Sequence, residues 1–529
     1  ATLGELVAWI IGWDLILEYA VGNVAVAIAW SGYFNSLLTA FGIDLPAWLT
    51  HGYRTALLSS NPEVDALLQT APRIAGIPIL LNVPAALIVL AVTWLLYIGV
   101  KESTRANNIM VVVKLLVLGF FVGLGAMHID PANYKPFAPN GWTGIHQGAA
   151  IVFFAYIGFD AISTAAEETK NPQRNMPIGI LAGLAICTLI YVIVGIVATG
   201  LVPYTELRAA DPLARALEVA GLPIASWFVA FGAVVSLTAV LLVFQYGQPR
   251  IFMAMARDGL LPQWAAKVHP KYRTPHITTI LTGLVVAAIA GVASIGEMVD
   301  LTNIGTLFAF MLVCGGVIIL RYKDPDRPRP FRVPGGIVIP VLGIFSCLYL
   351  MYFLPATSWF RFAAWLNLGF VIYIAYGAVR SRLTGRDTVG DAAAHDAETA
   401  WAGASLGAIG LGLMLIAFVF DVNSTAEPGQ FAAEFDRSLR DPSWFLVVPL
   451  ILNILLLYPV SILRANRARG QGITGKDRTR ALLAMAVSAV LLVASLVYVG
   501  MVLPTKLAPG PGTGAEKAAV SPTVQSRSQ

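Results

Sequence analysis

Residues 153–160 read Phe-Phe-Ala-Tyr-Ile-Gly-Phe-Asp and lie inside an apolar run over about 145–166. That run is long enough to cross the hydrocarbon core of a bilayer as a helix. Gly158 is a weak point in a helix, and Asp160 is a residue type that favours the N-cap, where a helix begins. The stretch therefore predicts a spanning helix that is interrupted near its middle. A continuous helix is the alternative, because single glycines are common in membrane helices.

Twelve further apolar runs along the chain are too long for strands. Together with 145–166 they predict thirteen spans, which are 3–41, 79–99, 106–128, 145–166, 178–201, 224–246, 276–294, 300–320, 337–355, 358–379, 402–420, 444–463 and 480–503. The first run is too long for one perpendicular span. We expect it to tilt, or to leave the bilayer from about Ser31.

The composition indicates a membrane protein and excludes other classes. Hydrophobic residues make up 57% of the 529 residues, charged residues make up 12%, and the mean hydropathy is +0.73. Soluble domains are about 25% charged, and disordered chains have low hydrophobicity. Three cysteines are no framework for a disulfide-stapled module. We therefore expect an all-α, polytopic bundle of transmembrane helices in the cell membrane, surrounded by lipid.

Lysine and arginine are unevenly distributed over the loops. If Ala1 lies on the cytoplasmic side, 23 of the 35 Lys and Arg residues fall in inside loops and 11 in outside stretches. The positive-inside rule favours this orientation, and it explains the net charge of +5 without nucleic-acid binding. We expect a cytoplasmic linker at 381–401, three C-terminal spans within 402–503, and a disordered external tail at 504–529.

The first run carries the carboxylates Glu5, Asp14 and Glu18, and charges at membrane depth are often functional. Asp14 and Glu18 share a helix face, so both should not stay unpaired and ionised. For Glu18 we favour a carboxylate that faces a cavity and receives a cation. A structural ion pair with a Lys or Arg of another helix is the alternative, and we favour that reading for Asp14 and Glu5.

Lys114 lies in the middle of the apolar run 107–121, too deep to reach water easily. A lysine that is removed from water releases its proton more readily, so Lys114 is a candidate proton carrier. If it stays charged, it supplies the charge that a bound cation would otherwise supply. A permanent ion pair with Asp14 or Asp160 is the alternative.

The sequence lacks the residue patterns of other chemistries. No zinc-binding Cys/His spacing and no nucleophile elbow are present, and Asp477 breaks the one near match to a phosphate loop, 470–477. We therefore expect no enzyme activity, no metal and no cofactor. A receptor usually has a substantial soluble domain, whereas the longest stretch between spans is only 42–78. A channel or a membrane receptor remains the alternative from a different class.

Four motifs resemble the amino acid–polyamine–organocation (APC) superfamily, and in particular its cationic amino acid transporter branch. They are Gly12-Trp-Asp-Leu-Ile-Leu-Glu-Tyr19, the stretch 158–179 beginning Gly-Phe-Asp-Ala-Ile-Ser-Thr, the stretch 247–262 beginning Gly-Gln-Pro-Arg-Ile-Phe-Met-Ala, and Leu301-Thr-Asn-Ile-Gly-Thr-Leu307. The resemblance covers about 1–380 and matches family helices 3–12. It implies two inverted repeats of five helices and secondary transport by alternating access.

The resemblance implies a substrate site at the interruption, which matches the unwound sixth helix of the family. The main chain at Phe154, Ala155 and Ile157 would accept the ammonium group of the substrate, beside Gly158. Phe159 would act as a lid over the site.

The resemblance also assigns roles to three charged residues. Glu18 matches a carboxylate near the distal, cationic end of the substrate. Lys114 matches the lysine that stands at the sodium position of sodium-coupled relatives, which implies coupling to protons. Asp160 belongs to the motif, and we expect it to be structural.

One departure is large, because the chain opens at what resembles the third helix of the family. We expect that the first two helices, which supply half of the substrate site, precede Ala1 in a longer protein, and that the sequence as printed does not transport.

The prediction is thus a proton-coupled secondary transporter of amino acids that favours cationic ones, such as lysine and arginine. A carrier or exchanger of neutral amino acids or polyamines on the same scaffold is the nearest alternative. These patterns indicate no oligomeric state.

Overall fold

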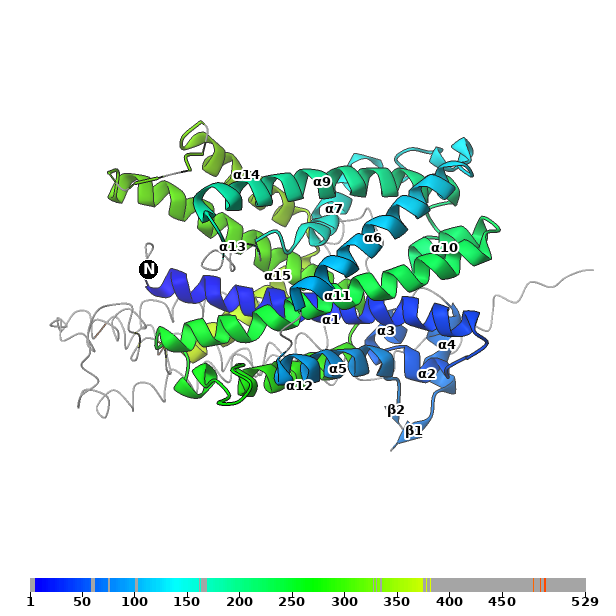
Figure 1. Cartoon of the computed structure of the whole chain (residues 1–529), viewed down its shortest axis with the longest axis horizontal. Coiled ribbons are helices and arrows are strands. Elements are labelled where there is room, and N and C mark those ends of the chain that lie inside the picture. The colour runs from blue at the N-terminus through cyan, green and yellow to red at the C-terminus, as the bar shows by residue number, and fades with distance from the viewer. Residues whose placement is uncertain are drawn as a thin grey trace, which may run out of the picture.

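The computed structural model describes residues 5–58, 62–74, 77–99, 103–160, 169–326 and 335–373, together with 162, 328–329, 331–333, 377, 381, 479, 486 and 490. These residues form long helices, most of which run along the bundle (Figure 1). The α-helices are α1 (Glu5–Ala40), α2 (Ala47–Thr50), α3 (Tyr53–Leu58), α4 (Pro62–Thr70), α5 (Val83–Ile98), α6 (Ser103–Ala126), α7 (Gly141–Val152), α9 (Pro172–Leu201), α10 (Pro212–Val219), α11 (Pro223–Arg257), α12 (His276–Val292), α13 (Ile295–Lys323), α14 (Val338–Tyr352) and α15 (Ala356–Ile372). Shorter elements are the 3₁₀ helices η1 (Pro131–Tyr134), η2 (Phe153–Tyr156) and η4 (Gln263–Ala266) and the strands β1 (Arg73–Ile74) and β2 (Ile77–Pro78), which pair antiparallel.

Five of these helices, α1, α6, α9, α11 and α13, are long and apolar enough to cross a membrane. Three more, α5, α12 and α14, are apolar but shorter. The predicted bundle of transmembrane helices is therefore confirmed within the described part of the chain, where the two short strands are the departure from an all-helical fold. Apart from 486 and 490, the last three of the thirteen predicted spans lie outside the described residues, so the number of spans and the inverted repeat stay predictions.

Helix α1 is the central element of the bundle. It packs mainly on α11 and α13 and also contacts α5, α12 and α15. In its most apolar window 72% of the residues are buried, whereas in α9 only 6% are. Helix α9 therefore lies at the surface of the described bundle. The 36 residues of α1 form one continuous helix, about 54 Å long at the standard rise. That length exceeds the hydrocarbon core of a bilayer, so a tilt of α1, or an end that leaves the bilayer from about Ser31, stays a prediction.

Buried polar side chains join α1 to its neighbours. The side-chain amide of Asn23 donates to Gln245 of α11, whose own amide donates to the Thr93 hydroxyl of α5 at 3.0 Å. Nearer the end of α1, the Ser31 hydroxyl donates to Asn82 Oδ1 at 2.6 Å, and the same oxygen caps the start of α5. In lipid such interhelical hydrogen bonds give helices a fixed mutual register.

The helix that contains the predicted span 224–246 is longer than the apolar run, because α11 continues to Arg257. Arginine ends an apolar run, but it also has good helix propensity. The hydropathy pattern therefore predicts where the membrane-embedded part of a helix ends, and the helix itself can continue beyond that point. The helix stops at Gly259, whose φ of 79° is in the left-handed region. The amides of Gly259 and Leu260 donate back to Ala256 and Met255, which is a Schellman motif.

The stretch 42–78 is also more ordered than a connecting loop. Figure 1 shows that its helices α2, α3 and α4 gather at one end of the bundle with the two strands. Arg54 of α3 donates through Nη2 and Nε to Glu297 in the first turn of α13, at 2.6 and 3.2 Å. Arg361 of α15 donates to the same carboxylate at 3.0 Å. Glu297 thus connects three elements that are distant in sequence.

Removal of the Glu297 carboxylate should lower stability. Arg361 and Glu297 are each only 6% exposed, and loss of one partner of a buried pair costs about 3–5 kcal/mol. We expect Glu297→Ala to lower the free energy of unfolding by about that amount. Thermal unfolding of the detergent-solubilised protein measures the change.

The matched control is Glu218→Ala, which removes an exposed partner of Arg215. Exposed pairs contribute about 0–1 kcal/mol, so this variant should unfold close to the wild-type temperature. Equal unfolding temperatures for the two variants would show that the Glu297 network does not stabilise the bundle.

Candidate functional site

The predicted interruption near Gly158 is confirmed. The α-helix that begins at Gly141 ends at Val152, a 3₁₀ turn follows over Phe153–Tyr156, and residues 157–160 form turns. Gly158 has a φ of 115°, a conformation that a side chain would strain. Its amide donates to Asp160 Oδ1 at 3.2 Å, so the Asp160 side chain closes the turn.

Side chains of two other helices hold carbonyl groups at the interruption. Asn303 of α13 is fully buried, and its amide donates to the carbonyls of Ala150 and Ile151 at 3.1 and 2.9 Å. The hydroxyl of Tyr191 in α9 donates to the Ala155 carbonyl at 2.7 Å. In a membrane, carbonyls that lose their helical partners need other donors, and these two residues supply them.

Beside the interruption lies a cavity of about 340 Å³, which is within the range of small-molecule sites. Its walls come from α1, α6, α9, α11 and the interrupted segment. The described residues that line it are Tyr19, Val111, Lys114, Ala155, Tyr156, Ile157, Gly158, Phe159, Ile162, Ile180, Gly183, Leu184, Cys187, Tyr191, Ala239, Val240, Val243 and Phe244.

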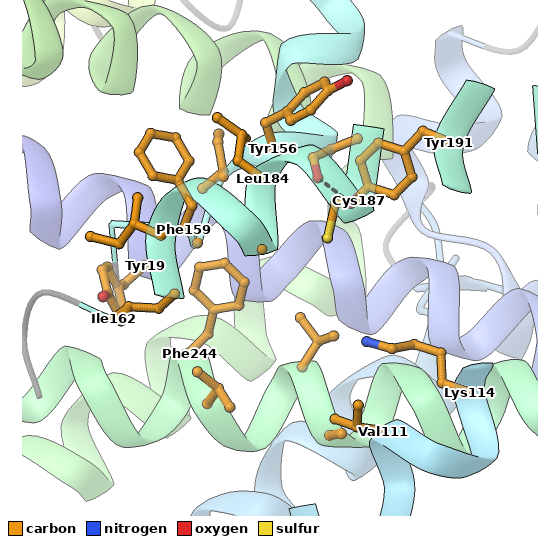
Figure 2. A pocket seen from close by; sticks show the side chains of 18 residues that line it. Tyr19, Val111, Lys114, Tyr156, Phe159, Ile162, Leu184, Cys187, Tyr191 and Phe244 are labelled. Carbon is orange, nitrogen blue, oxygen red and sulfur yellow. Dashed lines mark hydrogen bonds between the residues drawn. The ribbon is translucent and has the colours of Figure 1, made fainter. Parts of the chain in front are cut away.

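The lining is aromatic and aliphatic on most sides. Figure 2 shows Phe159, Tyr19 and Phe244 on one side, and Tyr156 and Tyr191 on another. The Lys114 side chain extends from α6 toward the centre (Figure 2). Among the described lining residues Lys114 is the one cationic side chain, and none carries a carboxylate. The cavity is thus an apolar chamber with one amine and one interrupted helix on its walls.

The structure therefore brings several of the predicted site residues together. Ala155, Ile157, Gly158, Phe159 and Lys114 all line this one cavity. The side chain of Phe154 instead packs against a core to which α1, α5, α11, α12 and α13 contribute, and the Phe154 carbonyl accepts the Ile157 amide at 3.2 Å.

Glu18 lies next to the cavity but is not among the described residues that line it. It is 1% exposed, and its Oε2 accepts the Thr306 hydroxyl of α13 at 2.8 Å. The carboxyl of Asp160 lies within interaction distance of Glu18. Glu18 thus links α1 to α13 immediately behind the interruption, and its predicted contact with substrate stays a prediction.

Asp14 and Glu5 occupy different surroundings. Asp14 is 1% exposed, and neither of its oxygens has a hydrogen-bond partner within the described ranges. The proposed pairing of Lys114 with Asp14 is therefore not formed. Glu5 accepts a hydrogen bond at 3.0 Å from Tyr373, a neutral hydroxyl.

Two residues of the site were missed by reasoning on individual residues. Asn303 belongs to the motif 301–307 but was not identified as a site residue. Its amide was nevertheless a signal, because polar side chains inside a membrane form hydrogen bonds to neighbouring helices. Tyr191 lies in the middle of the apolar run 178–201, whereas tyrosines that anchor at the interface lie near span ends. That position is the signal that could have identified it.

Comparison with known proteins identifies the relatives. Residues 1–379 match the family model described as amino acid permease. The branched-chain amino acid permease BcaP of Bacillus subtilis is 46% identical over 385 residues, which are 72% of this chain and 79% of the relative. The methylthioribose transporter of the same bacterium is 44% identical over 383 residues, 72% and 78% of the two chains.

A plant relative is more distant. The vacuolar cationic amino acid transporter 4 of Arabidopsis thaliana is 37% identical over 335 residues, which are 61% of this chain and 52% of the relative. The family model covers the interruption, the cavity and all five of the long apolar helices. The chain is therefore an integral membrane protein of the amino acid permease family, within the APC superfamily.

Proposed function

We propose that this protein is a secondary active transporter that moves amino acids across the cell membrane by alternating access. The observation that carries the proposal is that an interrupted helix and a lysine at membrane depth line one cavity. Transporters place substrate at such interruptions, because released backbone carbonyls bind cations and helix ends bind carboxylates. The chain belongs to a family of permeases, which is not an enzyme class.

The main chain of the interrupted segment supports binding of the ammonium group. Ala155 and Ile157 line the cavity on either side of Tyr156. An ammonium group carries N–H donors, and main-chain carbonyl oxygens accept hydrogen bonds from such donors. We assign the α-ammonium group of the substrate to these carbonyls and its side chain to the apolar part of the cavity.

The cavity favours a neutral, aliphatic side chain. Its wall includes Val111, Ile180, Leu184, Val240 and Val243, which bury apolar groups favourably. A cationic side chain in the same space would meet the Lys114 amine. The bacterial relative with 46% identity is named a branched-chain amino acid permease. Branched-chain amino acids are therefore the first substrate class that we propose.

Cationic amino acids are the second candidate, as the sequence suggested. Glu18 is a buried carboxylate directly behind the interruption, beside Asp160. Reorientation of the Glu18 side chain would present a negative charge to the cavity. Several plant relatives are named cationic amino acid transporters.

Lys114 is the group to which we assign proton coupling. Its amine faces the chamber in which the substrate is placed. A charge at this depth is costly, and titratable residues inside membranes often serve as proton relays. Transfer of the proton with the substrate would leave Lys114 neutral for part of the cycle.

Substitution of Lys114 should remove the pH dependence of uptake. In proteoliposomes that contain the full-length protein, we expect leucine uptake to rise as the external pH falls. Lys114→Ala should make uptake independent of the pH gradient, because no group then carries the proton. Lys114→Arg should behave in the same way, since arginine keeps its proton.

Lys135→Ala is the matched control. Lys135 is exposed and lies in the turn after η1, away from the cavity, so its loss should leave the pH profile unchanged. If Lys114→Ala keeps the wild-type pH dependence, Lys114 is not the coupling group.

Competition experiments test the substrate class. Excess isoleucine should suppress uptake of labelled leucine, whereas arginine and putrescine should not, because their positive charges meet Lys114 in an apolar chamber. The uptake of labelled leucine is measured with each of the three competitors at the same concentration.

Glu18→Gln distinguishes the two candidate classes. If arginine competes with leucine, and Glu18→Gln abolishes that competition while leucine uptake persists, the cationic class replaces the aliphatic one. The amide is close in size to the carboxylate, so this variant changes the charge and keeps an acceptor for Thr306.

A further inference from the structure

The hydroxyl of Tyr191 donates a hydrogen bond to the Ala155 carbonyl, which we assign to the ammonium group of the substrate. It donates to the Ala155 oxygen at 2.7 Å, across the interruption between α9 and the 3₁₀ turn (Figure 2, dashed line). Ala155 and Tyr191 both line the cavity. The bond therefore lies at the wall of the chamber and not behind it.

The position of the Tyr191 ring is supported independently of this hydrogen bond. The ring packs edge-on against Tyr156, with ring centroids 5.3 Å apart. Tyr191 is 39% exposed, so the residue is not tightly enclosed by its neighbours. Loss of the hydroxyl alone should therefore leave the ring in place.

A carbonyl at an interrupted helix needs a donor whenever the site is empty, because bare carbonyls are costly at membrane depth. When an amino acid is bound, its ammonium group supplies up to three N–H donors. Because Tyr191 and Ala155 both line the chamber, the hydroxyl and the ammonium group would approach the Ala155 oxygen from the same space. In the structure the Tyr191 hydroxyl is the donor to this oxygen.

We propose that Tyr191 is a positioning residue whose hydroxyl holds the Ala155 carbonyl in the empty transporter and is displaced by the ammonium group of the substrate. This inference rests on the proposed function. It adds that the empty and loaded states exchange one donor for another, so the hydroxyl competes with substrate. The same hydrogen bond would also keep the Ala155 carbonyl paired while the transporter, without substrate, changes back to its starting conformation.

Tyr191→Phe tests the exchange. It keeps the ring and removes the competing donor, so leucine should bind more tightly. A hydrogen bond contributes about 0.5–1.5 kcal/mol net, which corresponds to a dissociation constant lowered roughly two- to tenfold. Equilibrium binding of labelled leucine to the solubilised full-length protein measures this constant. A merely structural role predicts the opposite, because damage to the site weakens binding.

Tyr134→Phe is the matched control. The Tyr134 hydroxyl also donates to a main-chain carbonyl of α9, that of Ile196 at 2.8 Å, but Tyr134 is not among the described residues that line the cavity. Its loss should leave the leucine dissociation constant unchanged. Replacement of Tyr191 by 3-fluorotyrosine is a second test, because a more acidic hydroxyl donates more strongly and should weaken leucine binding.

Transport assays compare net uptake with exchange, a comparison that a binding assay does not provide. Net uptake requires return of the empty transporter, whereas exchange of leucine for leucine does not. Tyr191→Phe should lower net uptake relative to exchange, because the empty state has lost its resident donor.

Unchanged or weaker leucine binding by a folded Tyr191→Phe variant, with the wild type binding leucine, overturns this inference and leaves the proposed function intact. If the wild type binds arginine and not leucine, the same comparison is made with arginine, which carries the same ammonium group. A wild type that binds neither amino acid overturns both proposals.

Discussion

A helix that is interrupted inside a membrane must find partners for every backbone group that the interruption releases. In this protein two of those partners are side chains of other helices, Asn303 of α13 and Tyr191 of α9, and the third, Asp160, lies within the turn itself. The interruption near Gly158 is therefore possible only because α9 and α13 lie where they do. A ligand that donates hydrogen bonds to the same carbonyls would therefore change the contacts of α9 and α13 with the interrupted segment. This constraint connects the architecture of the bundle with the proposed binding of an amino acid.

The central position of α1 has a related consequence. Its buried face supplies Glu18 to α13 and its neighbour Tyr19 to the cavity, so one helix contacts the chamber and the support behind it. The chamber is apolar apart from Lys114 and a few hydroxyl, thiol and main-chain groups. A zwitterion with an aliphatic side chain matches this division, with its charged end at the interruption and its apolar end among the valines and isoleucines.

Much of this arrangement could be predicted from the sequence, because in lipid the hydropathy pattern and the cost of buried charge are strong constraints. The long apolar runs and the candidate role of Lys114 followed from these two rules, and the interruption followed from the conformational preferences of Gly158 and Asp160. The end of α11 at Arg257 did not, because hydropathy reports where the membrane stops and not where a helix stops. The partners of the released carbonyls also did not follow, since the contacts of Tyr191 with Ala155 and of Asn303 with Ala150 join residues 36 and 153 positions apart.

The central claim, that an amino acid occupies the cavity beside Gly158, is most directly tested through Cys187, an exposed thiol on its wall. The two other cysteines, Cys314 and Cys347, are not among the described lining residues, so Cys314→Ser and Cys347→Ser leave Cys187 as the reporter. The rate of its modification by a small water-soluble maleimide is measured with and without saturating leucine. The account predicts that leucine slows the modification severalfold and that putrescine does not. Equal rates at saturating concentrations of a transported amino acid would contradict it.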